Sequence, residues 1–185
     1  MIALYQGRSL GSRLIRWWTF GKYSHAAWVC RDGSVIESTM KTGVHELASL
    51  DDSHTDGTPV EVYTLPISDR QYAEIDAAMR AEIGKKYDWK AILGFALHAR
   101  LEQRMAWFCS ELVVGVLNKC GIFPLKHIEP FQVSPTFLSW SPFLKLAVKF
   151  KTRKADSHEK NPECHAPTVQ CPVVVQLRNS VAGAT

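Results

Sequence analysis

The sequence lacks the features of a protein that spans or crosses a membrane. Its 185 residues include no run of about 18 uncharged apolar residues, which is the length needed to span a bilayer. The N-terminus also lacks a basic start followed by an unbroken apolar stretch, so no cleavable signal peptide is recognised. We therefore expect a cytoplasmic protein with reduced thiols. A phage-encoded protein, or one exported by another route, would escape this argument.

Sequence patterns for nucleotides, metals and nucleic acids are also missing. There is no P-loop and no glycine pattern of a dinucleotide site. The net charge is only +4, with Lys and Arg scattered along the chain, so nucleic acid is not an expected partner. The spacing of Cys164, His165 and Cys171 matches no compact zinc ligand set. We predict no metal and no cofactor.

The composition is that of a globular domain. Hydrophobic residues make up 46% and charged residues 22%, which excludes a wholly disordered chain. The length suits one domain with a single core and a tail. After Phe150 the sequence becomes polar and contains prolines. We predict a domain over residues 1–150 and a mostly disordered tail over residues 151–185.

Alternation and turn residues predict several strands. They are expected over three stretches: residues 24–39, 59–65 and 144–150. Asp32-Gly33 supplies the turn of a hairpin within the first stretch. The polar residues 51–59 between the first two stretches are expected to form an exposed loop.

Helical spacing and end signals predict helices between these strands. They are expected over residues 7–18, from the capping box at Ser68 to Gly84, and from Cys109 to Gly121. Residues 91–97 are expected to form a buried helix or a pocket wall. Together these elements indicate an α+β fold.

The first of these helices has an apolar side with arginines around it. Its apolar residues are Leu10, Leu14, Trp17 and Trp18. Packing of this side on the sheet is the favoured interpretation. A helix lying on a membrane surface is the alternative, because Trp and Arg suit that interface. Peripheral membrane contact is therefore kept as a hypothesis.

Cys109 is the candidate nucleophile. It lies where the bulky pair Trp107-Phe108 leads into a predicted helix. Unpaired backbone N–H groups in the first turn of a helix favour thiolate over thiol, and the thiolate is the reactive form. An isolated cysteine is more often a small buried hydrophobe. Cys30 and Cys120 lack this context and are predicted to be packing residues.

His25 is the candidate base because it lies among small and apolar residues at the start of a predicted strand. The remaining histidines lie mostly in polar or loop-like surroundings and are predicted to be solvated: His45, His54, His98, His127, His158 and His165. A core histidine with a satisfied hydrogen bond is the alternative for His25. Nucleophile and base together would support thiol-dependent acyl transfer.

Glu37 is the candidate third residue, since a carboxylate on a strand that favours burial needs a partner. Facing His25, it would hold the imidazole and favour the imidazolium. A two-residue Asp32-Gly33 turn would place Glu37 on the face opposite His25. A loop with an odd number of residues would place both on one face. The residues alone do not choose between these two.

Several short motifs resemble those of a known family. They are Tyr23-Ser24-His25 before an apolar strand, Val35-Ile36-Glu37-Ser38, Gly84-Lys85-Lys86-Tyr87-Asp88 and Phe108-Cys109-Ser110-Glu111-Leu112-Val113. The set is similar to the circularly permuted papain-like hydrolases related to the NlpC-type cell-wall peptidases. The YiiX and YaeF-like group is nearest, and the lecithin:retinol acyltransferase group is more distant. His25 precedes Cys109 by 84 residues, which is the order of the permuted branch.

The resemblance implies roles for these residues. Cys109 would be the nucleophile, His25 the general base and Glu37 the third polar residue. The interval of 12 residues between His25 and Glu37 is similar to that in the acyltransferase relatives, which favours the one-face hairpin. The resemblance also implies an antiparallel sheet with the Cys109 helix packed against it, and the Cys109 N–H as an oxyanion donor.

The resemblance leaves the substrate open between a peptide-like amide and a lipid acyl group. Expected substrate contacts are Ser24, Tyr87, Trp107 and Phe108. Further apolar residues favour an acyl pocket or, equally, form core: Trp89, Ile92, Leu93 and Phe95. The predicted activity is a thiol hydrolase or acyltransferase. The alternative is a non-catalytic lipid- or peptide-binding module that keeps the fold.

Overall fold

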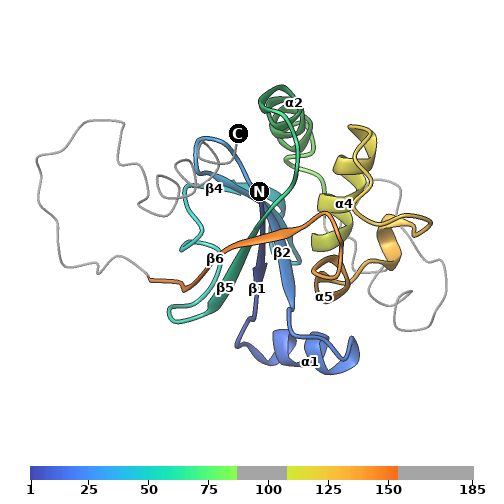
Figure 1. The fold of residues 1–185 in the computed structure, drawn as a ribbon. Coiled ribbons are helices and arrows are strands. Elements are labelled where there is room, and N and C mark those ends of the chain that lie inside the picture. Colours follow the sequence, from blue (N-terminus) through green and yellow to red (C-terminus); the bar gives the residue numbers. More distant parts are fainter. Residues whose placement is uncertain (87–107, 154–185) are drawn as a thin grey trace, which may run out of the picture.

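The computed structural model describes residues 1–86 and 108–153, which form one antiparallel sheet with helices beside it (Figure 1). The sheet has six strands in the order β4-β3-β2-β1-β5-β6, and each neighbouring pair is antiparallel. The strands are β1 (Ile2–Tyr5), β2 (His25–Val29), β3 (Val35–Thr39), β4 (Gly43–Leu47), β5 (Pro59–Thr64) and β6 (Lys145–Lys151). The α+β class expected from the sequence is confirmed.

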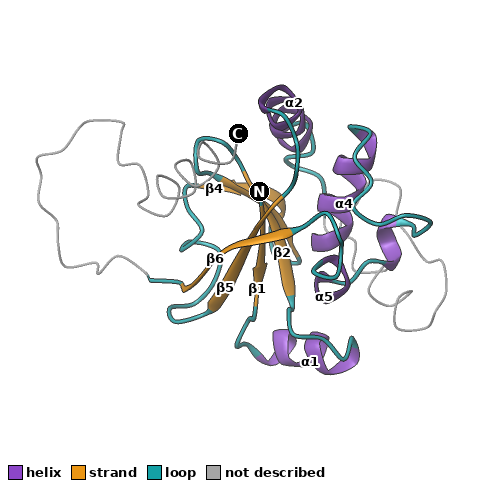
Figure 2. Ribbon diagram, viewed as in Figure 1, coloured by secondary structure: helices purple, strands orange, loops and turns teal. Residues whose placement is uncertain are grey.

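Serine caps fix where three of the helices begin. Ser9, Ser68 and Ser134 each accept a hydrogen bond from the backbone N–H three residues later, which satisfies a donor that the helix leaves unpaired. The helices are α1 (Leu10–Trp18), α2 (Asp69–Arg80), α4 (Cys109–Lys119) and α5 (Pro135–Leu138), with a 3-10 turn at Pro130–Gln132 (Figure 2). The predicted capping box at Ser68 is confirmed.

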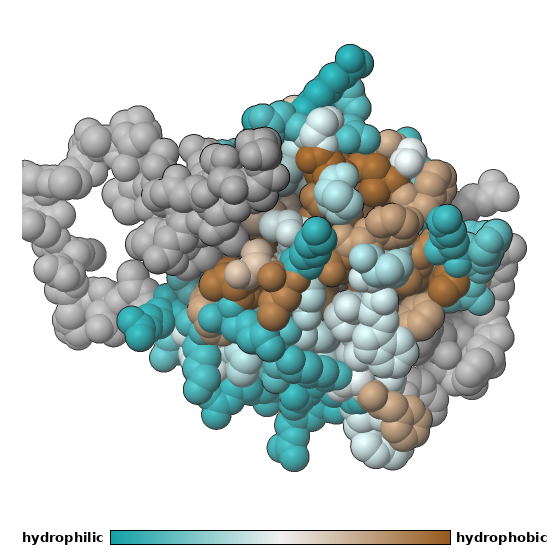
Figure 3. Space-filling model, in the orientation of Figure 1, coloured by the Kyte–Doolittle hydropathy of each residue, from teal (hydrophilic) through white to brown (hydrophobic). Residues whose placement is uncertain are grey.

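Successive residues of the central strands face opposite sides of the sheet. On one side, Ala26 and Trp28 belong to the core shared with α2 and α4. On the other side, Ala27 and Val29 pack with Leu50, which follows β4. Hydrophobic residues also gather between α2 and α4 on the face drawn in Figure 3. The sheet is therefore covered on both sides.

The α4 helix packs against β2 and β3. Every residue from Cys109 to Leu117 is buried, as expected for a helix that is apolar on most of its surface. The helix ends before Gly121, whose φ of 75° is the left-handed conformation that glycine adopts most easily. The core therefore fixes the N-terminal end of α4, and with it Cys109.

A buried polar contact fixes α2 against the sheet. The Trp28 indole N–H donates to Asp76 Oδ1 at 2.6 Å, and the Arg31 N–H donates to Asp76 Oδ2 at 3.0 Å. A buried carboxylate is tolerated when donors satisfy it in this way. Asp76 therefore joins α2 to the end of β2.

Three residues of the apolar side predicted for α1 do not pack on the sheet, which makes the favoured interpretation wrong for them; the side chain of the fourth, Trp18, lies outside the described part of the structure. Leu10, Leu14 and Trp17 are 82%, 62% and 66% exposed. These residues recur at i, i+4 and i+7, so they share one side of the helix. The side that packs against the protein includes Ile15 and Arg16, which are only partly exposed.

Several predictions concern residues 87–107 and 154–185, which lie outside the described residues. They include the buried segment at 91–97, the substrate contacts Tyr87 and Trp107, and the disordered tail. The division into a domain and a tail therefore stays a prediction. In the described part of the chain, no helix has the length and apolar character needed to span a membrane.

Candidate active site

The β2–β3 hairpin determines how His25 and Glu37 lie relative to each other. The Cys30 N–H donates to the Ser34 carbonyl oxygen at 2.8 Å, which closes a loop of three residues, Arg31-Asp32-Gly33. Gly33 has φ 96°, the left-handed position of this loop type. An odd loop brings His25 and Glu37 to one side. The two-residue turn is therefore wrong, and the alternative favoured by the resemblance is the one observed.

His25 and Glu37 form a largely buried pair. His25 Nε2 lies 2.8 Å from Glu37 Oε2, and the two residues are 8% and 2% exposed. Burial alone would lower the pKa of His25, but the charge of Glu37 and the contact with Cys109 outweigh it and raise that pKa to about 10. Burial alone would raise the pKa of Glu37, yet His25 holds it well below its usual range. At neutral pH the pair is imidazolium and carboxylate.

Cys109 is the first residue of α4, and Phe108 is its N-cap. The Phe108 N–H donates to Glu111 Oε2 at 3.1 Å, which ties the first turn together. Cys109 is 2% exposed and lies close enough to His25 to help raise the pKa of that imidazole. Because Nε2 of His25 bonds Glu37, Nδ1 is the ring nitrogen left for the thiol. The structure thus brings together the three residues proposed from the sequence.

Glu37 has two further partners that sequence reasoning missed. The Ser53 hydroxyl donates to Glu37 Oε2, and His45 Nε2 lies 3.4 Å from Oε1. His45 reaches this position because β4 pairs Glu37 directly with His45. The contact with Glu37 raises the pKa of His45. Both carboxylate oxygens therefore have partners, which fixes the orientation of the Glu37 carboxylate relative to His25.

His54 packs beside His25 and Ser53. Its ring stacks on Tyr5 with centroids 4.4 Å apart, and lies 5.1 Å from the ring of His25. His54 Nδ1 is 2.8 Å from Ser53 Oγ. Burial and the positive charge of His25 lower the pKa of His54 to about 3. His54 is thus a neutral ring that packs against the charged one.

These contacts correct two predictions. His45 and His54 were expected to be solvated, but both contact the site, and the loop over residues 51–59 is partly buried against it. Val44-His45-Glu46-Leu47 does not alternate between apolar and polar residues, so the sequence carried no clear strand signal that would place His45 beside Glu37. No local signal marks Ser53 and His54, because their position depends on how the loop folds back over the sheet.

Two of the four predicted substrate contacts, Ser24 and Phe108, lie in the described part of the structure. The Ser24 hydroxyl accepts from the Gly7 N–H at 2.9 Å and lies 3.4 Å from the Tyr5 carbonyl oxygen. Ser24 is 3% exposed, so its hydroxyl joins β2 to the chain that follows β1. Phe108 is partly buried beside Cys109. Its place at the entrance to α4 suits a substrate contact.

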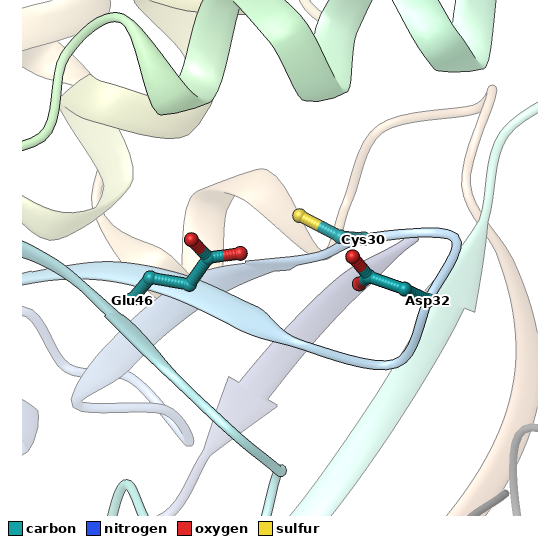
Figure 4. A group of neighbouring side chains, drawn as sticks. All are labelled: Cys30, Asp32 and Glu46. Carbon is teal, nitrogen blue, oxygen red and sulfur yellow. The ribbon is translucent and has the colours of Figure 1, made fainter. Parts of the chain in front are cut away.

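A group of potential metal ligands lies around the loop of the hairpin, away from the candidate active site (Figure 4). Ligand atoms of Cys30, Asp32 and Glu46 lie within 4.8 Å of one another. Arg80 Nη2 donates to Asp32 Oδ2 at 2.6 Å and to Glu46 Oε1 at 2.9 Å. Burial raises the pKa of the Cys30 thiol to about 12. Both carboxylates are already paired with a cation, and the thiol is protonated.

No protein-family model and no curated protein matches this chain. Among solved structures, it is similar in fold to the metalloprotein yiiX from Escherichia coli O157:H7. The TM-score is 0.61 at 18% sequence identity, and the match covers 80% of this chain and 95% of that chain. The expected similarity to the YiiX-like fold group is confirmed. At this identity the likeness shows the fold alone.

Proposed function

We propose that this protein is a cysteine-dependent hydrolase or acyltransferase with the site arrangement of the permuted papain-like group. One observation carries the proposal: His25 contacts both Glu37 and Cys109, and Cys109 begins a buried helix. Nucleophile, base and orienting carboxylate are the parts that activate a thiol for attack on a carbonyl. The YiiX-like fold supports this assignment.

In the proposed reaction, the Cys109 thiolate attacks the carbonyl carbon of an amide or ester, and a C–S bond forms. The oxygen becomes negative, and the backbone N–H groups at the start of α4 stabilise it. His25 then gives its proton to the leaving amine or alcohol as the carbonyl re-forms. Water, or another acceptor, loses a proton to His25 and attacks the thioester carbonyl; the C–S bond then breaks, which releases the acyl group and restores the Cys109 thiolate. Glu37 stabilises the imidazolium that protonates the leaving group, and it does so again when His25 takes a proton from the acceptor.

The YiiX neighbour is described as a metalloprotein, which raises the question whether this chain has a matching metal site. In residues 1–86 and 108–153, the group Cys30, Asp32 and Glu46 is the cluster with the right spacing. It does not fit a cation, because Arg80 already occupies both carboxylates and the buried thiol is protonated. No step of the proposed reaction uses a metal.

Two substrate classes are proposed, peptide-like amides and lipid esters or amides. A non-catalytic lipid- or peptide-binding module is the second candidate function. The burial of Cys109 and His25 is compatible with either. The two functions differ in whether an acyl group becomes attached to Cys109.

The direct experiment is trapping of the acyl-enzyme. The purified protein is mixed with a p-nitrophenyl acyl ester, quenched in acid and weighed by mass spectrometry. We expect one acyl group on Cys109, and we expect Cys109→Ala to lose both the adduct and turnover. Cys30→Ala is the matched control, since Cys30 is equally buried but lies next to Asp32 rather than a histidine. Acylation that persists in a folded Cys109→Ala protein would sink the proposal.

A further inference from the structure

The α1 helix exposes a set of large apolar side chains. Leu10, Leu14 and Trp17 form one stripe, and Phe20 follows directly after the helix with 93% of its surface exposed. Scattered single apolar residues on a surface are ordinary, but a group within one short segment marks an interaction site. We call these four residues the α1 apolar face.

Phe20 is unusual for a reason of backbone conformation. The Gly21 N–H bonds the Arg16 carbonyl oxygen at 2.9 Å, and the Phe20 N–H bonds that of Trp17 at 3.3 Å, which is the hydrogen-bond pattern of a left-handed helix stop. Phe20 occupies the position with positive φ, at 47°, where glycine is normally found. A large aromatic side chain is unfavourable there. Since the ring is exposed, the fold gains nothing in return.

The segment that holds the α1 apolar face carries charge of one sign. Residues 6–31 contain no Asp or Glu, and Arg8 and Arg13 are both exposed. Arg13 lies on the helix beside the apolar stripe, three residues after Leu10, whereas Arg8 reaches toward Gly57. Two copies of this chain meeting through the face would bring these cations together. An anionic surface would be attracted to them. Exposed aromatic and leucine side chains flanked by arginine are typical of helices that lie in a bilayer interface.

The face also lies near the candidate active site in the fold. Tyr5 at the end of β1 pairs with His25 at the start of β2, so the segment that contains α1 joins these two residues. Figure 1 shows α1 beyond that end of the sheet. On the face drawn in Figure 3, a hydrophobic projection stands at the bottom of the molecule, next to the end of α1.

We propose that the α1 apolar face, with Arg13, docks the protein onto the surface of a lipid bilayer that carries anionic headgroups. Trp17 and Phe20 enter the interface, and Arg13 remains at the level of the phosphates. This places the end of the sheet that holds His25 toward the membrane. Docking does not depend on Cys109 chemistry, so a result that contradicts this proposal leaves the proposed function unaffected, and the reverse is also true.

The test is co-sedimentation with phosphatidylcholine vesicles with and without phosphatidylserine. We expect the full chain to bind the anionic vesicles more strongly, with binding that weakens as salt rises. Phe20→Gly should reduce the association constant by about tenfold, since the ring no longer enters the interface. Arg13→Gln should reduce it by about fivefold. Cys109→Ala should bind like the wild type.

Phe20→Gly is informative because it is expected to fold at least as well as the wild type, glycine being favoured at positive φ. Phe123→Ala is the matched control, since Phe123 is 55% exposed and lies past the opposite end of α4 from Cys109. Equal binding by Phe20→Gly and the wild type, or no binding by the wild type, would overturn the proposal. So would a dimer in light scattering that Phe20→Gly converts to a monomer, because a second copy would then cover the face.

Discussion

A buried cysteine lies near carboxylates at each end of the β2–β3 hairpin, Cys30 at the loop end and Cys109 of α4 at the open end, but the two ends differ in what balances the negative charge. At the loop end, Arg80 pairs with both Asp32 and Glu46, and the Cys30 thiol stays protonated. At the open end, the cation facing Glu37 is His25, which can give up its proton. A permanent cation makes a structural cluster, and a titratable one makes a site that can move protons.

The second difference is the backbone around each cysteine. Cys30 follows a strand and bonds across the hairpin, so its N–H is already used. Cys109 begins α4, where the N–H groups of the first turn have no partner within the helix. These groups favour negative charge on the sulfur and on a substrate oxygen. Composition alone therefore does not distinguish the two ends, whereas the backbone does.

Glu37→Gln, at the open end of the hairpin, is expected to have the largest effect on turnover. The change keeps the shape but removes the charge that raises the pKa of His25. We expect turnover to fall by about 100-fold and the free energy of unfolding at pH 7 to fall by about 3 kcal/mol. Turnover and urea denaturation check the two effects. A variant with full turnover would show that His25 needs no carboxylate.

The stability lost in Glu37→Gln should depend on pH. His25 has its pKa raised to about 10 when folded, so its contribution is complete below about 6.5 and disappears as pH rises through the folded value. Glu37 has a lowered pKa, so its contribution is complete above about 4.5 and disappears as pH falls. The difference in unfolding free energy between wild type and variant should therefore be largest between these limits. A difference that is constant with pH would contradict the assigned pair.

Ser53→Ala tests the support of Glu37 and should have a smaller effect. One hydroxyl that donates to the carboxylate is lost, while His25 and His45 remain. We expect turnover to fall by about tenfold, since one hydrogen bond to a charged group contributes at least about 1.5 kcal/mol. His45→Gln gives a comparison from the other oxygen. Unchanged rates in both variants would show that Glu37 is held without them.

Arg80→Gln changes the loop end of the hairpin and should have the smallest effect on turnover. The pairs with Asp32 and Glu46 are partly exposed, so we expect a loss of about 1 kcal/mol in stability. Turnover should stay within about twofold of the wild type at a temperature where both are folded. A large loss of rate in the folded variant would mean that the two ends of the hairpin are coupled.

The sequence predicted those features that depend on neighbouring residues. The capping serine at Ser68, the helix stop at Gly121 and the position of Cys109 at a helix start all follow from local patterns. The register of the hairpin did not, because Asp32-Gly33 suits both a two-residue turn and the last part of a three-residue loop. The observed loop has Gly33 at its left-handed position.

Features that depend on distant contacts were missed or misread. The strands β1 and β4 were not predicted, and β4 carries His45 to Glu37. Ser53 and His54 reach the site only because their loop folds back against Tyr5. The apolar side of α1 has the periodicity of a helix packed on a core, yet it is exposed. Periodicity identifies an apolar side but not what covers it.

The most direct test of the account is the pH dependence of alkylation by iodoacetamide, measured cysteine by cysteine with peptide mass spectrometry. If the sulfur of Cys109 is paired with His25, its rate should change little between pH 6 and pH 8 and should fall in His25→Gln. Cys30 and Cys120, as unpaired thiols, should become about tenfold more reactive per pH unit over this range. A Cys109 rate that rises in parallel with theirs, and that ignores His25→Gln, would contradict the account.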